Sequence, residues 1–325
     1  NLPAGAAGSI VAVKDYLNTF DSNALTIVPN GSDKIGGTNA NYEVTTESLS
    51  LTLIYVDATR GWVDVHESTQ AVKGATYMTA TVSGSCNTLA NCGNYKIATF
   101  KGPGTFCVSS IASCATNNIV DYAVVAGGGA GPATGGGDGI SGGGGGGGFR
   151  FYANTTTNPQ TGPAAPINNF PSGTAITVSA TGYPITIGGG GPKGTAPSGW
   201  SNGSDSVFST ITSTGGGRGG RGDPSPTGQD GGSGGGGDNG DAGGSGNTPA
   251  TPIAQGTNGG GAPGVSAGGG GGGALVAGTA GANPSGGPGG DGAGITGFGT
   301  TGQSCGGQYY FSGGGGGGNG NANTG

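Results

Sequence analysis

Hydrophobic and polar residues alternate in short segments over the first 126 residues of the chain. Several segments alternate with a period of two and are rich in β-branched residues, as half-buried β-strands are. No long stretch has the 3.6-residue period of an amphipathic helix. We predict eight strands, at Ser9–Asp15, Leu25–Val28, Leu49–Asp57, Gly61–Glu67, Tyr77–Ser83, Lys96–Phe100, Thr105–Ile111 and Val120–Val125.

Two turn signals connect predicted strands. Asn30-Gly31 follows Leu25–Val28, and this dipeptide favours the positive φ angles of a type I′ hairpin turn. Asp57–Gly61 separates two strands and has the right length for a hairpin loop. We expect two small all-β modules, at residues 1–70 and 71–126.

The pattern changes after Ala126, because glycine becomes the commonest residue. Of the 85 glycines, 11 lie in residues 1–126 and 74 lie in residues 127–325. Most of the latter form runs such as Gly142–Gly148, which are separated by turn-rich loops. The remaining strand-like segments are Phe149–Tyr152, Ala175–Ala180, Pro184–Ile187 and Val207–Thr212. Residues 127–325 therefore form a third region with a different physical basis.

The glycine runs allow two structures. Glycine-rich segments usually act as flexible linkers, because glycine loses much conformational freedom on folding. The alternative is polyglycine II, a helix with three residues per turn and a rise of about 3.1 Å per residue. Such helices can pack into a lattice whose backbone groups bond to neighbouring helices, since no Cβ keeps them apart. The embedded apolar strands and the scarcity of charge favour this order, and the residues alone leave both structures open.

Composition excludes several other classes. The glycines have no G-X-Y period, so the chain is not collagen. An α-helical bundle is excluded because glycine costs about 1 kcal/mol per helical position. No run of 18 apolar residues exists, so we expect no membrane insertion. The net charge of -6 argues against nucleic acid as a partner. His66 is the one histidine, and we predict no cofactor, no metal site and no enzyme activity.

Longer segments of the chain resemble a known group of proteins. They are ATFKGPGTFCVSS (Ala98–Ser110), VDYAVVAGGGAG (Val120–Gly131), GGGGGGGFRFY (Gly142–Tyr152), ITVSATGYPITIGGGG (Ile176–Gly191) and SNGSDSVFSTITSTGGGRGG (Ser201–Gly220). In this order they resemble the glycine-rich C-terminal region of tail-fibre and adhesin proteins of tailed bacteriophages. Ala12–Gly37 and Tyr55–Val65 resemble a small β module of the same fibres. The resemblance implies a polyglycine II lattice that carries exposed loops.

The loops between the glycine runs are the predicted recognition elements. They lie at Ala153–Ser172, Lys193–Asn202, Asp223–Asp230, Asn247–Asn258, Thr279–Ser285 and Thr300–Phe311. Aromatic and small polar residues together are typical of binding loops. The candidates for receptor contact are Trp200, Arg218, Arg221, Phe298, Tyr309, Tyr310 and Phe311. The alternative for each aromatic ring is packing against the flank of the lattice.

The cysteines suggest two short disulfide-closed loops, Cys86–Cys92 and Cys107–Cys114. Their spacings fit no common zinc motif, and disulfides persist outside the cell. Free structural thiols are the alternative. Asp238–Asp241 could offer oxygen ligands to Ca²⁺, but a solvated turn is the better interpretation of this segment.

We therefore expect an all-β protein with a polyglycine II lattice, short hairpins and essentially no α-helix. Its predicted function is non-enzymatic recognition of a host surface, through a glycan or outer-membrane protein, as a distal fibre or adhesin component. The predicted location is the virion surface or the cell exterior, and the predicted assembly is a homotrimer or homopolymer. The alternative is a structural subunit of an extracellular filament, in which the β part contacts other subunits and the glycine-rich part forms the shell.

Overall fold

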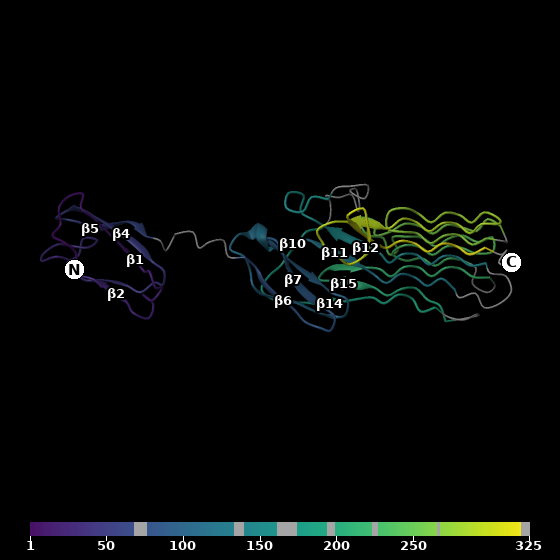
Figure 1. The fold of residues 1–325 in the computed structure, drawn as a ribbon, viewed down its shortest axis with the longest axis horizontal. Coiled ribbons are helices and arrows are strands. Elements are labelled where there is room, and N and C mark those ends of the chain that lie inside the picture. The colour runs from purple at the N-terminus through teal and green to yellow at the C-terminus, as the bar shows by residue number, and fades with distance from the viewer. Residues whose placement is uncertain are drawn as a thin grey trace. The chain divides into compact units, whose positions relative to one another are not determined.

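The computed structural model describes residues 1–67, 77–132, 140–160, 174–193, 199–222, 227–264 and 267–319. The chain forms two compact units, Asn1–Thr76 and Tyr77–Gly325 (Figure 1). Among the described residues, strands in small antiparallel sheets account for the regular structure, apart from the 3₁₀ turn η1 at Ala115–Asn118. The prediction of an all-β chain with essentially no α-helix is confirmed. None of the helical structure in these ranges has the length and apolar character needed to span a membrane.

The first unit contains a three-stranded and a two-stranded sheet. The three-stranded sheet has the order β1-β4-β5, with bounds Ile10–Lys14, Ser50–Asp57 and Gly61–Glu67. The two-stranded sheet pairs β2 (Leu25–Ile27) with β3 (Tyr42–Val44). Along β4 the side chains alternate, and Leu51 and Leu53 lie inside with Trp62 of β5, which is fully buried. The period-two pattern of the sequence therefore places one face of the sheet in the core.

One predicted turn of this unit is confirmed and the other is wrong. β4 and β5 pair around Asp57–Gly61, where the Asp57 carboxylate accepts the N–H groups of Thr59 and Arg60. Asn30-Gly31 is not a two-residue hairpin turn, because β2 pairs with the next strand, β3, across the long connection of residues 28–41. Gly31 does have a positive φ of 54°, so the dipeptide turns the chain inside a longer connection. The dipeptide thus marks a turn but does not determine the length of the connection between the paired strands.

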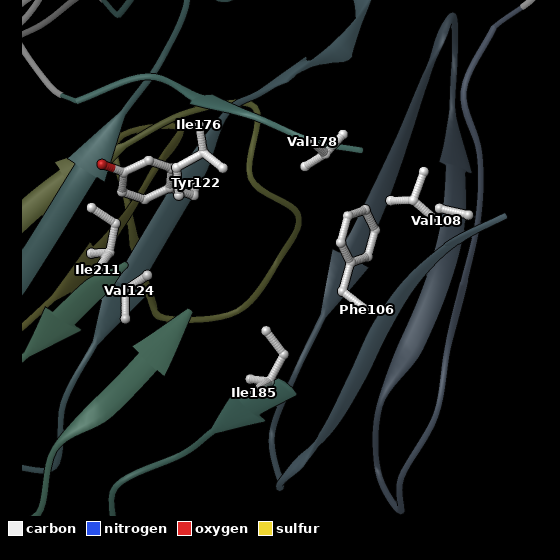
Figure 2. Close-up of a cluster of buried hydrophobic side chains, with 9 residues drawn as sticks. Phe106, Val108, Tyr122, Val124, Ile176, Val178, Ile185 and Ile211 are labelled. Atoms are coloured by element: carbon white, nitrogen blue, oxygen red, sulfur yellow. The ribbon is translucent and has the colours of Figure 1, made fainter. Parts of the chain in front are cut away.

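The second unit joins segments on either side of Ala126 in a five-stranded sheet. Its order is β16-β15-β14-β9-β6, with bounds Ile211–Ser213, Ser206–Phe208, Gly182–Thr186, Gly104–Ser110 and Thr79–Val82. Figure 2 shows the hydrophobic cluster of this unit, in which Phe106 and Val108 of β9 lie with Ile185 of β14. Residues before and after the start of the glycine runs thus share one core.

Four smaller groups of strands complete this unit. β7 (Thr88–Cys92) pairs with β8 (Tyr95–Thr99), β10 (Ile119–Val120) with β13 (Ile176–Thr177), and β11 (Tyr122–Val125) with β12 (Phe149–Tyr152). The last sheet has the order β17-β19-β18, with bounds Ala293–Ile295, Gln308–Phe311 and Gln303–Cys305. β18 and β19 lie where we predicted an exposed loop at Thr300–Phe311. Strands of three or four residues are too short to show a clear period, so the sequence pattern did not reveal them.

Several strands continue directly into glycine runs, and these runs lie side by side in Figure 1. We call the packed runs between Ala126 and Gly318 the glycine bundle. Its base is the end next to the strands, where Gly148 precedes β12 and Thr214 follows β16. Its tip is the opposite end, where backbone hydrogen bonds link Gly142 to Gly220 and Gly268 to Gly318. The strands therefore set the position of each run at the base.

Candidate functional site

The backbone hydrogen bonds of Gly268–Gly273 define the packing inside the glycine bundle. Each of the six N–H groups donates to a carbonyl oxygen of another segment, at N···O distances of 2.8–3.0 Å. The acceptors, taken in order from Gly268 to Gly273, are Gly318, Gly237, Thr279, Gly315, Gly234 and Val276. Residues three apart thus donate to the same neighbour. This is the three-residue repeat of polyglycine II, whereas a β-strand repeats every two residues.

The carbonyl groups of the same run bond to three further segments. Each accepts one backbone N–H, at 2.8–3.1 Å. The donors, in the same order, are Gly287, Gly143, Gly260, Gly290, Gly146 and Thr257. The run therefore has six hydrogen-bonded neighbours. Ordering a residue costs about 1–2 kcal/mol, and two hydrogen bonds worth about 0.5–1.5 kcal/mol each can offset that cost. The glycine runs are an ordered bundle, as the polyglycine II prediction requires.

Glycine is needed in the interior because a side chain would not fit. A Cβ atom on Gly270 would lie 1.9 Å from the carbonyl oxygen of Pro288, and one on Gly271 would lie 2.1 Å from that of Gly144. None of the glycines of Gly268–Gly273 has a positive φ. Glycine is therefore required in this run because it has no side chain, and not because it can adopt the left-handed backbone conformation.

Two polar side chains are accommodated within the bundle. Ser233 is fully buried, and its hydroxyl donates to the Gly273 carbonyl oxygen at 3.0 Å. Gln255 is buried at the base, where its Oε1 accepts the Thr214 N–H at 2.8 Å. Gln255 thus supplies an acceptor to a backbone N–H, whereas Ser233 adds a hydroxyl donor to a carbonyl that also accepts the Thr257 N–H.

The tip brings together three of the predicted contact residues. Trp200 is 8 % exposed, and its indole N–H donates to the Gly219 carbonyl at 3.1 Å. The guanidinium carbon of Arg218 lies over the Trp200 ring, 5.3 Å from its centroid. Burial lowers the pKa of Arg218. Trp200 therefore supports the arginine, and the partly exposed guanidinium is the group that can meet a ligand.

Arg221, the third of these residues, lies beside a buried carboxylate. Asp238 is 2 % exposed, and its Oδ2 accepts the Gly222 N–H at 2.6 Å. Its Oδ1 has no partner among the described residues. Burial raises the pKa of Asp238, although the charge of Arg221 acts in the opposite direction. The interpretation of Asp238–Asp241 as a solvated turn is wrong for Asp238, which is buried, and no group of three His, Cys, Asp or Glu side chains that could hold a metal ion occurs in the described ranges.

The other predicted aromatic residues lie at the base. Phe298 and Phe311 pack on the cluster of Phe149 and Phe151, with centroid distances of 5.3 Å for Phe151–Phe298 and 6.2 Å for Phe149–Phe311. Tyr309 and Tyr310 are partly buried on β19. The seven candidates thus occupy two opposite ends of the bundle and cannot form a single contact surface.

The predicted loops divide in the same way. Asn247–Asn258 and Thr300–Phe311 lie at the base, whereas Thr279–Ser285 lies at the tip. Ala153–Ser172, Lys193–Asn202 and Asp223–Asp230 each extend in part outside the described residues. A binding surface made by all six loops together is therefore not formed.

The four cysteines predicted to pair are free and exposed in the structure, and so is Cys305. In each predicted pair one cysteine lies in a strand, Cys92 at the end of β7 and Cys107 within β9, whereas Cys86 and Cys114 lie outside the strands. Cys114 has a pKa below its usual value because the Thr116 hydroxyl and backbone hydrogen bond to its thiol. The structure gives the two predicted disulfides no support.

The glycine-rich part of the chain matches a known family. Residues 101–325 match the family described as "Glycine-rich domain", and the chain therefore belongs to that family. No curated protein and no solved structure is detectably similar to the chain. The match covers the glycine bundle together with strands β9 to β19.

Proposed function

We propose that the chain is a non-enzymatic recognition protein of the virion surface or cell exterior, and that the tip of the glycine bundle contacts the receptor. The proposal rests on the hydrogen bonds of the bundle, which hold the ends of the tip segments at fixed positions. Loops on a rigid scaffold lose little entropy on binding, which favours affinity. The resemblance to tail-fibre adhesins supports a bacterial glycan or outer-membrane protein as the receptor.

Arg218 is the side chain of the tip that best fits this role. Asn202 Oδ1 accepts its backbone N–H at 2.9 Å, and its carbonyl accepts the Gln229 N–H at 2.9 Å. Among the described residues no carboxylate forms an ion pair with its guanidinium. A partly buried guanidinium of this kind gains from a bidentate contact to a carboxylate. We therefore propose an acidic group, such as that of an acidic sugar, as part of the receptor.

The test is adsorption of the labelled protein to a panel of bacterial cells and to their purified surface polysaccharides. We expect binding, and a loss of roughly 10- to 100-fold in the Arg218→Ala variant, since hydrogen bonds to charged groups contribute about 1.5–3 kcal/mol. Arg150→Ala is the matched control, because Arg150 is equally half-buried but lies on β12 at the base. Equal losses in the two variants, or no adsorption to any cell or glycan, would count against the proposal.

A second candidate is a subunit of an extracellular filament. One observation favours it, because β1 is an edge strand and no described strand pairs with its outer side. Ile10 on β1 is 64 % exposed, and an uncovered strand of this kind can pair with another chain. Electron microscopy of dilute and concentrated protein separates the two candidates. Long regular filaments would favour the filament subunit, and discrete particles would favour the recognition protein.

A further inference from the structure

The outer run Gly313–Gly318 has an incomplete set of neighbours. Its N–H groups follow the three-residue repeat, since Gly314 and Gly317 donate to Gly290 and Gly287, and Gly315 donates to Gly144. A helix with three residues per turn directs its N–H groups to three sides. Gly314 and Gly317 face one side, Gly315 faces the second, and Gly313 and Gly316 face the third. Neither has a hydrogen-bond partner among the described residues. Within the described ranges, one row of donors on this run is therefore open.

The same two glycines are not required by the packing of the molecule itself. Both are exposed, and a Cβ atom on either would lie 3.9 Å from its nearest neighbour, an ordinary contact. In the interior run the corresponding distance is near 2 Å, as at Gly271. Glycine at Gly313 and Gly316 thus has an entropic cost, and the packing of the described residues gives no reason for it.

Two other outer segments of the bundle carry side chains at the exposed positions that correspond to Gly313 and Gly316. In Asp241–Gly246 the exposed positions, three residues apart, carry the side chains of Ala242 and Ser245. In Gly286–Asp291 they are Pro288 and Asp291. Glycine occurs in these segments only where the backbone approaches a neighbour. Gly313–Gly318 differs from these two segments because its outward positions are glycine, a feature that it shares with Gly189 and Gly190 of the run Gly188–Gly191.

We propose that the face formed by Gly313 and Gly316 binds a glycine helix of a second copy of this chain. A neighbour that accepts both N–H groups must present carbonyl oxygens with the same three-residue spacing, as Thr279 and Val276 do toward Gly270 and Gly273. A polyglycine II helix has this spacing, and the chain itself supplies such helices. The contact would continue the packing of the bundle across two molecules. This proposal does not depend on receptor binding by the tip, which lies at the end of the bundle and not on its side.

The test compares the mass of the full chain in dilute and concentrated solution by light scattering after size exclusion. We expect the wild-type chain to assemble with concentration, and the double variant Gly313→Val, Gly316→Val to remain a monomer. Because both positions have room for a side chain, the double variant should melt at nearly the wild-type temperature. Gly264→Val is the matched control, since a Cβ there meets nothing within 4 Å and the residue lies in a tip connection.

A second measurement keeps the test decisive if the double variant proves unstable. Hydrogen exchange of the wild-type chain should show protection of the Gly313 and Gly316 amides that increases with protein concentration. A wild-type chain that stays monomeric at every concentration would overturn the proposal. So would assembly of a folded double variant equal to that of the wild type, or amides whose exchange does not respond to concentration.

Discussion

At the scale of single residues, the glycines of the bundle have two different roles. Gly271 is buried, and its missing side chain leaves room for the carbonyl of Gly144, 2.1 Å from where a Cβ would lie. Gly189 is exposed, and a Cβ there would meet nothing within 4 Å. Two glycines, neither of which has a positive φ, therefore differ in what they contribute to stability.

Substitution to alanine should separate these roles. We expect Gly271→Ala to destabilise the second unit by at least about 2 kcal/mol, as overpacked interiors do, and to lower its melting temperature by about 4–8 °C. Gly189→Ala should leave the melting temperature unchanged or slightly raised, because alanine restricts the unfolded chain. Thermal unfolding followed by circular dichroism provides the measurement. Equal melting temperatures for the two variants would contradict the six-neighbour packing.

A single carboxylate also organises the first unit. Asp15 is 2 % exposed and accepts the N–H groups of Thr19, Phe20 and Ser48. Desolvation raises the pKa of Asp15, but these backbone hydrogen bonds lower it by more, so that it lies below the ordinary value of 3.8. A carboxyl whose pKa is lower in the folded state stabilises the fold above its unfolded pKa.

The pH dependence of the first unit follows from this shift. The stabilisation by Asp15 should be complete at neutral pH and should disappear as the pH falls from 3.8 through the lower folded pKa. The Asp15→Asn variant should melt at a lower temperature at neutral pH. Its melting temperature should also lack the decrease at acid pH that protonation of Asp15 causes in the wild type. Melting curves of both proteins at neutral and acid pH test the prediction, which fails if their difference is independent of pH.

At the scale of elements, the glycine helix differs from a strand in its repeat. The bonds of Gly268–Gly273 return to the same neighbour every third residue. One glycine inserted into this run rotates the residues that follow by a third of a turn, so that their N–H groups face the wrong neighbours. Three inserted glycines restore the direction of every group and lengthen the run by one turn.

We therefore expect the one-residue insertion to be the more damaging, although it is the smaller change. The chain with three added glycines after Gly270 should retain most of its amide protection in hydrogen exchange. The chain with one added glycine should lose protection in Gly268–Gly273 and in the neighbouring run Gly142–Gly148. If both insertions reduce protection equally, a three-residue repeat does not govern the packing.

The sequence predicted elements well where a local pattern determines them. The alternation of Leu51 and Leu53 with polar residues predicted β4. The long glycine runs alone left a flexible linker and polyglycine II open, and the resemblance to tail-fibre proteins implied the lattice. Two features were not predictable locally. The β17-β19-β18 sheet forms by pairing between short strands that are distant in sequence. Whether a predicted receptor-contact residue lies at the tip or the base depends on the direction in which its glycine run crosses the bundle.

At the scale of the whole molecule, the chain consists of two compact units with separate cores. Trp62 is fully buried in the first unit, where it packs edge-on against Tyr55 at a centroid distance of 5.5 Å. Val108 is 2 % exposed in the hydrophobic cluster of the second unit. Each unit buries its own large apolar side chains and has its own hydrogen-bonded sheets, so each can unfold on its own.

This arrangement predicts two independent transitions. Trp62→Ala should destabilise the first unit by about 3–5 kcal/mol and leave the transition of the second unit in place. Val108→Ala should lower the second transition only. Residues 77–325 alone should then fold with an intact glycine bundle, and should adsorb to cells as the full chain does if the tip is the binding surface. A calorimetric scan in which either substitution shifts both transitions would show that the two units unfold together. If adsorption to cells requires Asn1–Thr76, the tip is not sufficient for receptor binding.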